Sequence, residues 1–247
     1  MEKQVRQGNI VKANAQIVHL FFVIKETIVF IGHFAVGLAA KKWSPKVNLG
    51  FSFMACQLLD LIWPVLVLIG IEKVHVDPLA TKVTPFDFEY YPYSHSLVMT
   101  ILYSGLIGFL AFRIYKNLKS ALVLGFVVLS HWILDFITHR PDLPIFLGKF
   151  KLGLGLWNSV LFTFFVEVGM YILGVWIFLR STPHMSKMKK IGFAILIGFL
   201  FVVYLANLFG PKPPIELPSS AIAAPALSMW LIVLWGYWVD KKQPKEQ

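Results

Sequence analysis

Five stretches of this sequence are long and apolar enough to cross a lipid bilayer, and they constrain the fold more than any other feature. A helix needs about 20 consecutive apolar residues to cross the hydrocarbon core. A spanning segment must satisfy its own backbone polar groups, and the alternation typical of barrel strands is absent, so each stretch is predicted to be a helix. The stretches are residues 96–112, 119–138, 157–179, 191–209 and 221–239.

The composition agrees with a membrane protein. Of the 247 residues, 57% are hydrophobic and 15% are charged, whereas a soluble domain carries about 25% charged residues. We therefore expect an all-α fold, a polytopic membrane helical bundle with six to seven transmembrane helices, as a single membrane domain over residues 1–247. Its predicted parts are a polar N-terminal segment at 1–16, a core at 28–150 that carries the polar cluster described below, and three further membrane helices within 157–239.

The expected helix boundaries include one open alternative. Residues 17–40 are mostly apolar but are interrupted by Lys25 and Glu26. They form either one helix or an interfacial helix that leads into a shorter membrane helix at 27–40. The remaining spans are predicted at about 48–71, 96–113, 119–139, 157–179, 188–209 and 219–239.

Basic residues gather in alternate loops, which predicts the orientation. The loops at 41–47, 113–119 and 180–190 and the C-terminal tail are rich in Lys and Arg, while the 72–95 loop is acidic. The positive-inside bias places the basic loops and the C-terminus in the cytoplasm. The 140–156 loop, with Arg140, Lys149 and Lys151, departs from the pattern. The net charge of +10 follows from this clustering, so no nucleic-acid partner is expected.

The fourth predicted span ends in an unusual row of ionisable residues, His131, Asp135 and His139. A spacing of four residues keeps side chains on nearly one face of a helix. Imidazole and carboxylate groups at i and i+4 can converge on one metal ion, as paired histidines do on a zincin helix. Ionisable residues inside a membrane helix are costly and mark functional sites by default. A bland alternative is that a buried His only hydrogen-bonds within the bundle, and His139 also fits an interfacial position.

Other predicted spans carry matching residues. They are His33, Asp60, His95 and Glu167. With the 41–47 loop in the cytoplasm, His33, Asp60, His95, His131 and Asp135 share a depth between the midplane and the outer surface. We expect His33, Asp60, His95, His131, Asp135 and His139 to supply metal ligands. Nitrogen and oxygen ligands favour Zn²⁺, with Mn or Fe as alternatives, and the single cysteine, Cys56, offers no thiolate site.

At these residues the sequence resembles the YdjM-type family of bacterial membrane-bound metal-dependent hydrolases. The shared pattern is His33 with Gly37, Asp60, Ser94-His95-Ser96-Leu97, and His131 with Asp135. The resemblance covers roughly residues 28–150. The family often has Pro-Asp-x-Asp where this chain has Leu58-Leu59-Asp60, and His-Arg-Gly where it has Tyr90-Tyr91-Pro92. Because these potential ligands are missing, a single metal is favoured over two or three, and His139 is a candidate substitute ligand.

The resemblance implies a metal-dependent hydrolase in the bacterial cytoplasmic (inner) membrane. At this depth the expected substrate is a membrane lipid or a lipid-linked ester or phosphoester, and Asp60 or Glu167 is the candidate catalytic base. The alternative is a proton or divalent-metal transporter that uses the same cluster. A third is a haem-binding or structural protein with His33 and His131 as axial ligands. The sequence sets no oligomeric state.

Overall fold

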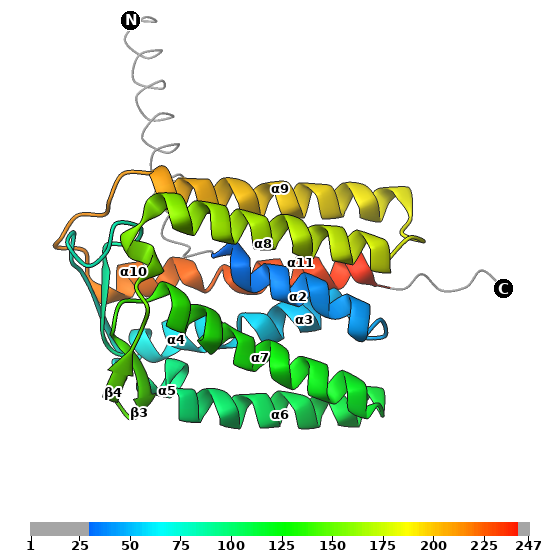
Figure 1. Ribbon diagram of the computed structural model, residues 1–247, viewed down its shortest axis with the longest axis horizontal. Coiled ribbons are helices and arrows are strands. Elements are labelled where there is room, and N and C mark those ends of the chain that lie inside the picture. Colours follow the sequence, from blue (N-terminus) through cyan, green and yellow to red (C-terminus); the bar gives the residue numbers. More distant parts are fainter. Residues whose placement is uncertain (1–29, 242–247) are drawn as a thin grey trace, which may run out of the picture.

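The computed structural model describes residues 30–241 (Figure 1). The predicted polar segment at 1–16 and the part of the 17–40 stretch up to residue 29 lie outside the described residues. Within the described residues, five helical spans have the length and composition to cross a membrane. They are α6 (Leu97–Tyr115), α7 (Leu118–Thr138), α8 (Val160–Ser181), α9 (Lys187–Phe209) and the segment Ser219–Asp240, which consists of α10 (Ser219–Ala226) and α11 (Met229–Asp240).

A sixth span is broken. Helices α3 (Leu49–Cys56) and α4 (Leu58–Leu68) pass the same test together but are bent by 57° at Gln57. Each of the six predicted spans therefore has a counterpart, and the predicted all-α, polytopic membrane bundle is confirmed. The first described helix, α2 (Ile31–Trp43), has only 13 residues, which gives it a length of about 20 Å. It is too short to cross a bilayer unaided.

Small elements connect the spans at one end of the bundle. Strands β1 (Lys73–Val76) and β2 (Phe86–Tyr90) form an antiparallel pair, as do β3 (Leu143–Phe146) and β4 (Lys149–Leu152). The short helix α5 (Pro92–His95) and a 3₁₀ turn, η1 (Leu156–Asn158), lie beside them. Figure 1 shows these elements on the left, and we call this side the hairpin end. The opposite side carries the α2–α3, α6–α7 and α8–α9 connections and is called the basic end.

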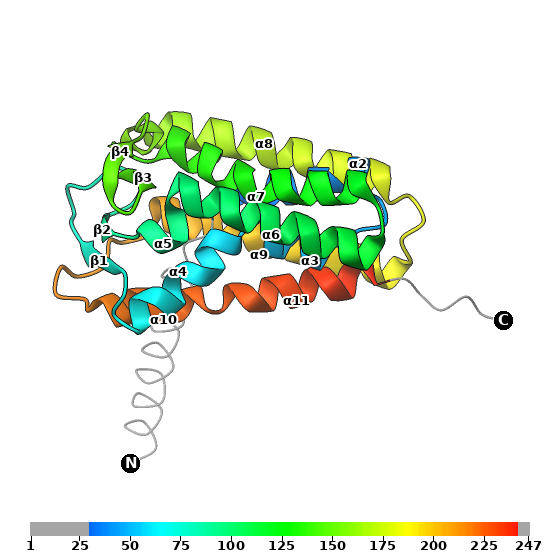
Figure 2. The same ribbon diagram turned by 90° about the horizontal axis from the view of Figure 1, so that it is seen from below.

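The short helix α2 packs most extensively against α8, and a glycine permits this contact. A Cβ atom on Gly174 would lie 2.6 Å from the carbonyl oxygen of Ala35, so only a residue without a side chain lets the two backbones approach this closely. Figure 2 shows the other layer, in which α3 lies against α11 and α4 against α10. As a result, α2 places His33 and α4 places Asp60 toward the middle of the bundle.

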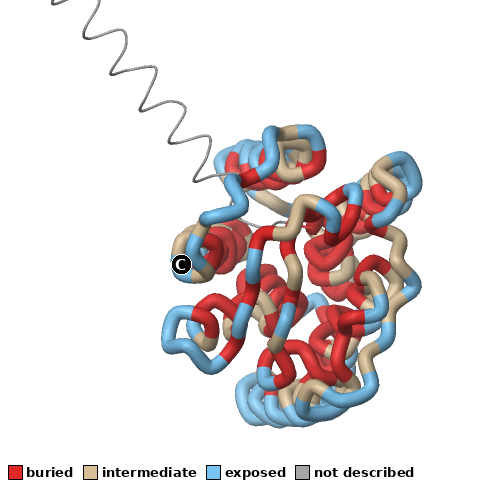
Figure 3. The backbone as a smooth tube through the Cα atoms, turned by 90° about the vertical axis from the view of Figure 1, so that its left-hand side faces the viewer, coloured by how far each residue is buried: buried red, intermediate tan, exposed pale blue. Residues whose placement is uncertain are grey.

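The burial pattern fits a lipid environment. Viewed from the hairpin end, buried backbone fills the centre while exposed segments form the rim (Figure 3). Only 17% of the apolar window of α6 is buried, and its outward side chains are large hydrophobic residues such as Ile101, Leu106 and Phe109. In water this surface would be strongly unfavourable. These apolar helices define an integral, multi-pass membrane protein.

One group of ion pairs lies at each end of the bundle. At the basic end, Lys41 pairs with Asp240 and also donates to the Val47 carbonyl at 2.8 Å. At the hairpin end, Arg140, which departs from the predicted charge pattern, pairs with Asp87 and with Asp142. Neutralised in this way, Arg140 adds little free positive charge to that end. Which end faces the cytoplasm stays a prediction.

Candidate metal centre

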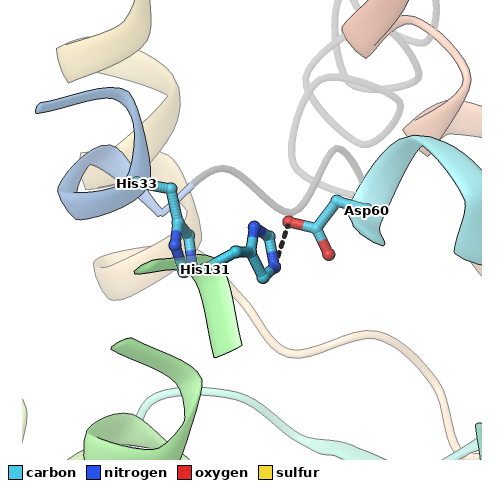
Figure 4. A group of neighbouring side chains, drawn as sticks. All are labelled: His33, Asp60 and His131. Atoms are coloured by element: carbon cyan, nitrogen blue, oxygen red, sulfur yellow. Dashed lines mark ion pairs between the residues drawn. The ribbon is translucent and has the colours of Figure 1, made fainter. Parts of the chain in front are cut away.

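Five of the predicted residues from four helices meet inside the bundle, near the hairpin end. His33 comes from α2, Asp60 from α4 and His95 from α5, while His131 and Asp135 lie one turn apart on α7. All are buried except Asp60, which is half-buried. Figure 4 shows His33, Asp60 and His131 approaching one another from separate helices. We call these five residues the His/Asp cluster.

Each histidine of the cluster turns its Nε2 atom toward a carboxylate. Nε2 of His33 lies 3.2 Å from Oδ1 of Asp135. Nε2 of His131 lies 3.3 Å from Oδ2 of the same aspartate and 3.7 Å from Oδ2 of Asp60. Nε2 of His95 lies 3.3 Å from Oδ1 of Asp60 and 3.8 Å from Oδ2 of Asp135. Potential ligand atoms therefore surround one small volume.

These atoms form two overlapping groups with the proximity that metal binding requires. His33, Asp60 and His131 offer atoms within 4.8 Å of one another, and so do His95, His131 and Asp135. His131 belongs to both groups. Among the described residues, His131 Nε2 and Asp135 Oδ2 lack hydrogen-bond partners although both are fully buried. Leaving buried polar atoms unpaired is unfavourable, and a divalent cation between them would remove that cost.

The cluster also carries an unbalanced charge. Its two carboxylates are paired with the three histidines and, within residues 30–241, with no lysine or arginine. With neutral imidazoles the net charge of the cluster would be −2, which a divalent ion would neutralise. Buried carboxylates without compensation are strongly unfavourable in a membrane interior. The donor set therefore suits a divalent cation.

The orientation of His131 is determined by a backbone carbonyl. Its Nδ1 lies 2.7 Å from the carbonyl oxygen of Cys56, and because a carbonyl only accepts hydrogen bonds, Nδ1 carries the proton. Nε2 is then the atom left to bind a cation, as in metal sites whose ligating histidine donates its other N–H to a neighbour. The ring of His33 stacks against that of His131, with centroids 4.0 Å apart and planes 8° from parallel.

His95 is also held by hydrogen bonds, which run through Ser94 to the buried carboxyl group of Glu72. Its Nδ1 lies 2.7 Å from Oγ of Ser94, and that hydroxyl donates to Oε2 of Glu72 at 2.6 Å. Glu72 Oε1 also accepts from the N–H groups of Tyr93 and Ser94, each at 2.8 Å, so Glu72 caps α5. Burial raises the pKa of the Glu72 carboxyl, and the Ser94 hydrogen bonds partly oppose this.

Sequence reasoning missed the contribution of Glu72, because it was read only as part of the acidic loop at 72–95. Its position directly after the apolar run at 48–71 is the signal that could have found it. A charged residue at that boundary lies close enough to the membrane interior to support a buried ligand.

His139 does not join either group of potential ligands. Its Nδ1 lies 2.9 Å from Oδ1 of Asp142, and the Tyr91 hydroxyl donates to the same oxygen at 3.2 Å. Burial opposes ionisation of Asp142, but His139 and Arg140 outweigh it and lower the pKa of this carboxyl. Burial, and then the charge of Asp142, raise the pKa of Tyr91. His139 is thus one half of a His–Asp dyad beside the cluster.

Glu167 lies on α8 next to the start of α2, outside both groups. Its Oε2 accepts from the Gly32 N–H at 3.4 Å. The N-cap residue of α2, Phe30, makes no side-chain capping bond, so Glu167 supplies an acceptor that the helix N-terminus would otherwise lack. Its contact is therefore with the helix that carries His33 rather than with the cluster itself.

A cavity adjoins the cluster. It is lined by Asp60, Asp135, His95 and His139 together with apolar and aromatic residues, among them Tyr91 and Trp157. The space open to the centre of a water molecule is about 20 Å³, and about 10–15 Å³ is enough for one water. The cavity therefore brings the dyad and the cluster to one shared, water-sized space.

No family model, curated protein or solved structure matches this chain. The fold and the site nevertheless define a class. The chain is a multi-pass membrane protein whose buried histidines and aspartates form groups that could hold a metal ion.

Proposed function

We propose that this chain is a membrane-embedded, metal-dependent hydrolase of the YdjM type, acting on a lipid or lipid-linked ester or phosphoester. The observation that carries the proposal is the convergence of three histidines and two aspartates, in which His131 Nε2 and Asp135 Oδ2 lie 3.3 Å apart in the protein interior and neither makes a hydrogen bond to any described residue. The motif resemblance over residues 28–150 supports hydrolysis. We place the protein in the bacterial cytoplasmic membrane, with the basic end and C-terminus inside and the cluster in the outer half.

In this proposal the His/Asp cluster holds the ion. His33, His95 and His131 offer imidazole nitrogens, and Asp60 and Asp135 offer carboxylate oxygens. This combination suits Zn²⁺ best, with Mn²⁺ or Fe²⁺ as alternatives. Since both ligand groups share His131, a single ion is the simplest arrangement. A bound divalent ion would polarise the ester or phosphoester and lower the pKa of a water molecule.

The chain's own residues supply the proton transfer. The side chain of Asp60 is 20% exposed, against 4% for Asp135, and Asp60 lines the cavity. With Asp135 as the carboxylate ligand, Asp60 is the better placed of the two to stay free of the ion and take a proton from water. His139 lines the same cavity, and its bond to Asp142 is the arrangement that orients a histidine for acid or base catalysis. We assign the protonation of the leaving group to His139.

The surroundings of the cavity favour a lipid substrate. Phe30, Trp63, Phe88, Trp157 and Met229 line it, and it lies within a bundle whose outer face is apolar. A space of about 20 Å³ holds about one water molecule and leaves no room for an acyl chain. We therefore expect the chains of the substrate to stay in the surrounding lipid while its polar group reaches the cluster.

The transporter alternative requires polar residues that continue toward the basic end. Between the cluster and that end, the buried residues of α2 and α7 include Phe34, Leu38, Leu124, Val127 and Val128. The buried polar side chains on this side, such as Lys41 and Ser120, lie near the basic end itself. Because the intervening side chains are apolar, they favour the hydrolase over an ion pathway.

Metal analysis of the purified protein tests the proposal. We expect about one bound transition-metal ion per chain in wild type and in His75→Ala, a matched control at an exposed histidine of β1 that pairs with Glu89. His131→Ala and the double variant with Asp135→Ala should lose the metal. Unchanged content in these variants would overturn the metal site.

A second assay separates enzyme from binder. Lipid esters and phosphoesters are offered to the reconstituted protein with and without a chelator, and Zn²⁺ is then restored. Chelator-sensitive hydrolysis that is lost in His131→Ala supports the proposal. A protein that binds metal but hydrolyses none of these lipids, and instead moves Zn²⁺ or protons across proteoliposomes, would favour the transporter.

A further inference from the structure

The β3–β4 hairpin exposes an unusual amount of apolar surface outside the membrane helices. Phe150 is 79% exposed, and Phe146, Leu147 and Leu152 are also exposed. The neighbouring Leu154 is 67% exposed. Large apolar side chains exposed together on one short hairpin mark an interaction site. None of these residues lines the cavity beside the cluster.

The backbone of the hairpin is strained at two of these apolar residues. Leu147 and Gly148 connect the paired residues Phe146 and Lys149, and both have positive φ, 36° and 79°. Such a two-residue turn strongly favours Asn-Gly, because Asn tolerates positive φ far better than Leu does. Phe150 also has a positive φ of 54°. Strain of this kind persists where a side chain serves a purpose, so the large apolar side chains at the tip need a reason other than turn formation.

The position of the hairpin supplies that reason. Strand β3 packs against α5 and α6, and α5 directly precedes the membrane span that begins at Leu97. Figure 1 shows β3 and β4 beside this point, at the edge of the bundle. On its inner side Gly148 lies against the ring of Tyr90. Since a span that begins at Leu97 enters the hydrocarbon core there, we expect the apolar tip to lie at the level where the core meets the headgroups.

The charges of the hairpin match that boundary. Lys149 is exposed next to Phe150, and Lys151 donates to the Glu89 carbonyl at 3.0 Å. Aromatic residues combined with lysines are typical of segments that lie in the membrane interface, where the rings contact acyl chains and the ammonium groups approach lipid phosphates.

We propose that the β3–β4 hairpin inserts its tip into the leaflet at the hairpin end and binds anionic phospholipid there. Phe146, Leu147 and Phe150 enter the boundary between headgroups and acyl chains, and Lys149 contacts lipid phosphate. This inference does not depend on metal binding or hydrolysis.

A fluorescent label on the full-length, vesicle-reconstituted protein tests the insertion. Cys56 is the single cysteine and is buried, so a polarity-sensitive fluorophore attaches selectively to Phe150→Cys. The matched control is Leu79→Cys, in the connection between β1 and β2, where the native side chain is 91% exposed. We expect the label at 150 to emit at shorter wavelength and to be quenched by spin labels on the acyl chains. The label at 79 should be quenched by aqueous iodide instead.

Two further measurements make the outcome decisive. Adding phosphatidylglycerol to phosphatidylcholine vesicles should increase lipid quenching at position 150, and adding Lys149→Glu should abolish that increase. Leu147→Asn, which fits the turn better, should leave the protein folded but reduce lipid quenching. The proposal is overturned if the label at 150 behaves like the label at 79. It is also overturned if the label is shielded without lipid quenching and becomes exposed on dilution in detergent, because a second copy of the chain would then cover the tip.

Discussion

His131 Nδ1 donates to the carbonyl oxygen of Cys56 across 2.7 Å, at the point where α3 and α4 bend by 57°. In a continuous helix that carbonyl would accept from the N–H four residues further on, which belongs to Asp60. Here it accepts from a side chain on α7. Sharp bends arise where a side chain enters the ladder of a helix in this way. The same bond orients the His131 ring and lies at the helix break next to Asp60. The positions of these two candidate metal ligands are therefore coupled to the shape of the α3–α4 segment.

The Glu72–Ser94–His95 chain should control metal affinity. Ser94→Ala removes the acceptor of the His95 Nδ1 proton, and Glu72→Gln weakens the bond that orients Ser94. We expect each variant to lower the affinity for Zn²⁺ by about 10–100-fold, measured by titration against a competing chelator. Glu89→Gln, an exposed glutamate of β2 that pairs with His75, is the control. Equal affinity in Ser94→Ala and Glu89→Gln would contradict the positioning role.

Glu167 should act through helix α2. Glu167→Gln keeps an oxygen that accepts from the Gly32 N–H, whereas Glu167→Leu leaves this buried donor unpaired at a cost of about 1–3 kcal/mol. We expect thermal unfolding in detergent to show a lower midpoint for the Leu variant and little change for the Gln variant. Both should retain bound metal when folded. If Glu167→Gln keeps its metal but loses all hydrolysis, Glu167 is the catalytic base after all.

Two glycines of α8 provide a matched pair. A Cβ on Gly174 would clash with the Ala35 backbone, whereas a Cβ on Gly169 would meet nothing within 4 Å. Gly174→Ala should therefore destabilise the protein by about 1–3 kcal/mol by overpacking and reduce metal content, because it displaces the helix that carries His33. Gly169→Ala should be neutral or stabilising by up to about 1 kcal/mol. Unfolding midpoints and metal content measured in parallel check both.

The lowered pKa of the Asp142 carboxyl predicts that the protein loses stability in acid. His139 and Arg140 lower its pKa below the usual value of 3.8 against the opposing effect of burial. A carboxyl whose pKa is lower in the folded state stabilises the protein fully above its unfolded pKa and loses this contribution as the pH falls through the folded value. Wild type should thus exceed Asp142→Asn in unfolding midpoint near neutral pH, and the gap should close below about pH 4. A gap independent of pH would show that the charge of Asp142 is not the cause.

The helices and most of the cluster were predictable because they depend on local patterns. Apolar runs determine the spans, and ionisable residues inside such runs stand out. The break at Gln57 was not predictable, since residues 48–71 form one apolar run and the bond that accompanies the break comes from a residue 75 positions away. For the same reason the sequence does not separate His139, which pairs with Asp142, from the residues of the His/Asp cluster. The neighbouring Asp142 was visible in the sequence, but nothing indicated that the carboxylate would turn back toward Nδ1.

The apolar packing between the cluster and the basic end has a consequence for sidedness. Leu38, Phe53 and Leu124 fill the interior there, and the Lys41–Asp240 pair ties α2 to α11 behind them. In the proposed function this packing would act as a barrier, so we expect water, protons and small polar products to exchange with the hairpin side only. Chemistry in the cavity beside the His/Asp cluster would therefore respond to the pH and metal supply of the hairpin side. It would be insulated from those of the opposite compartment, although the protein lies in the membrane that separates the two.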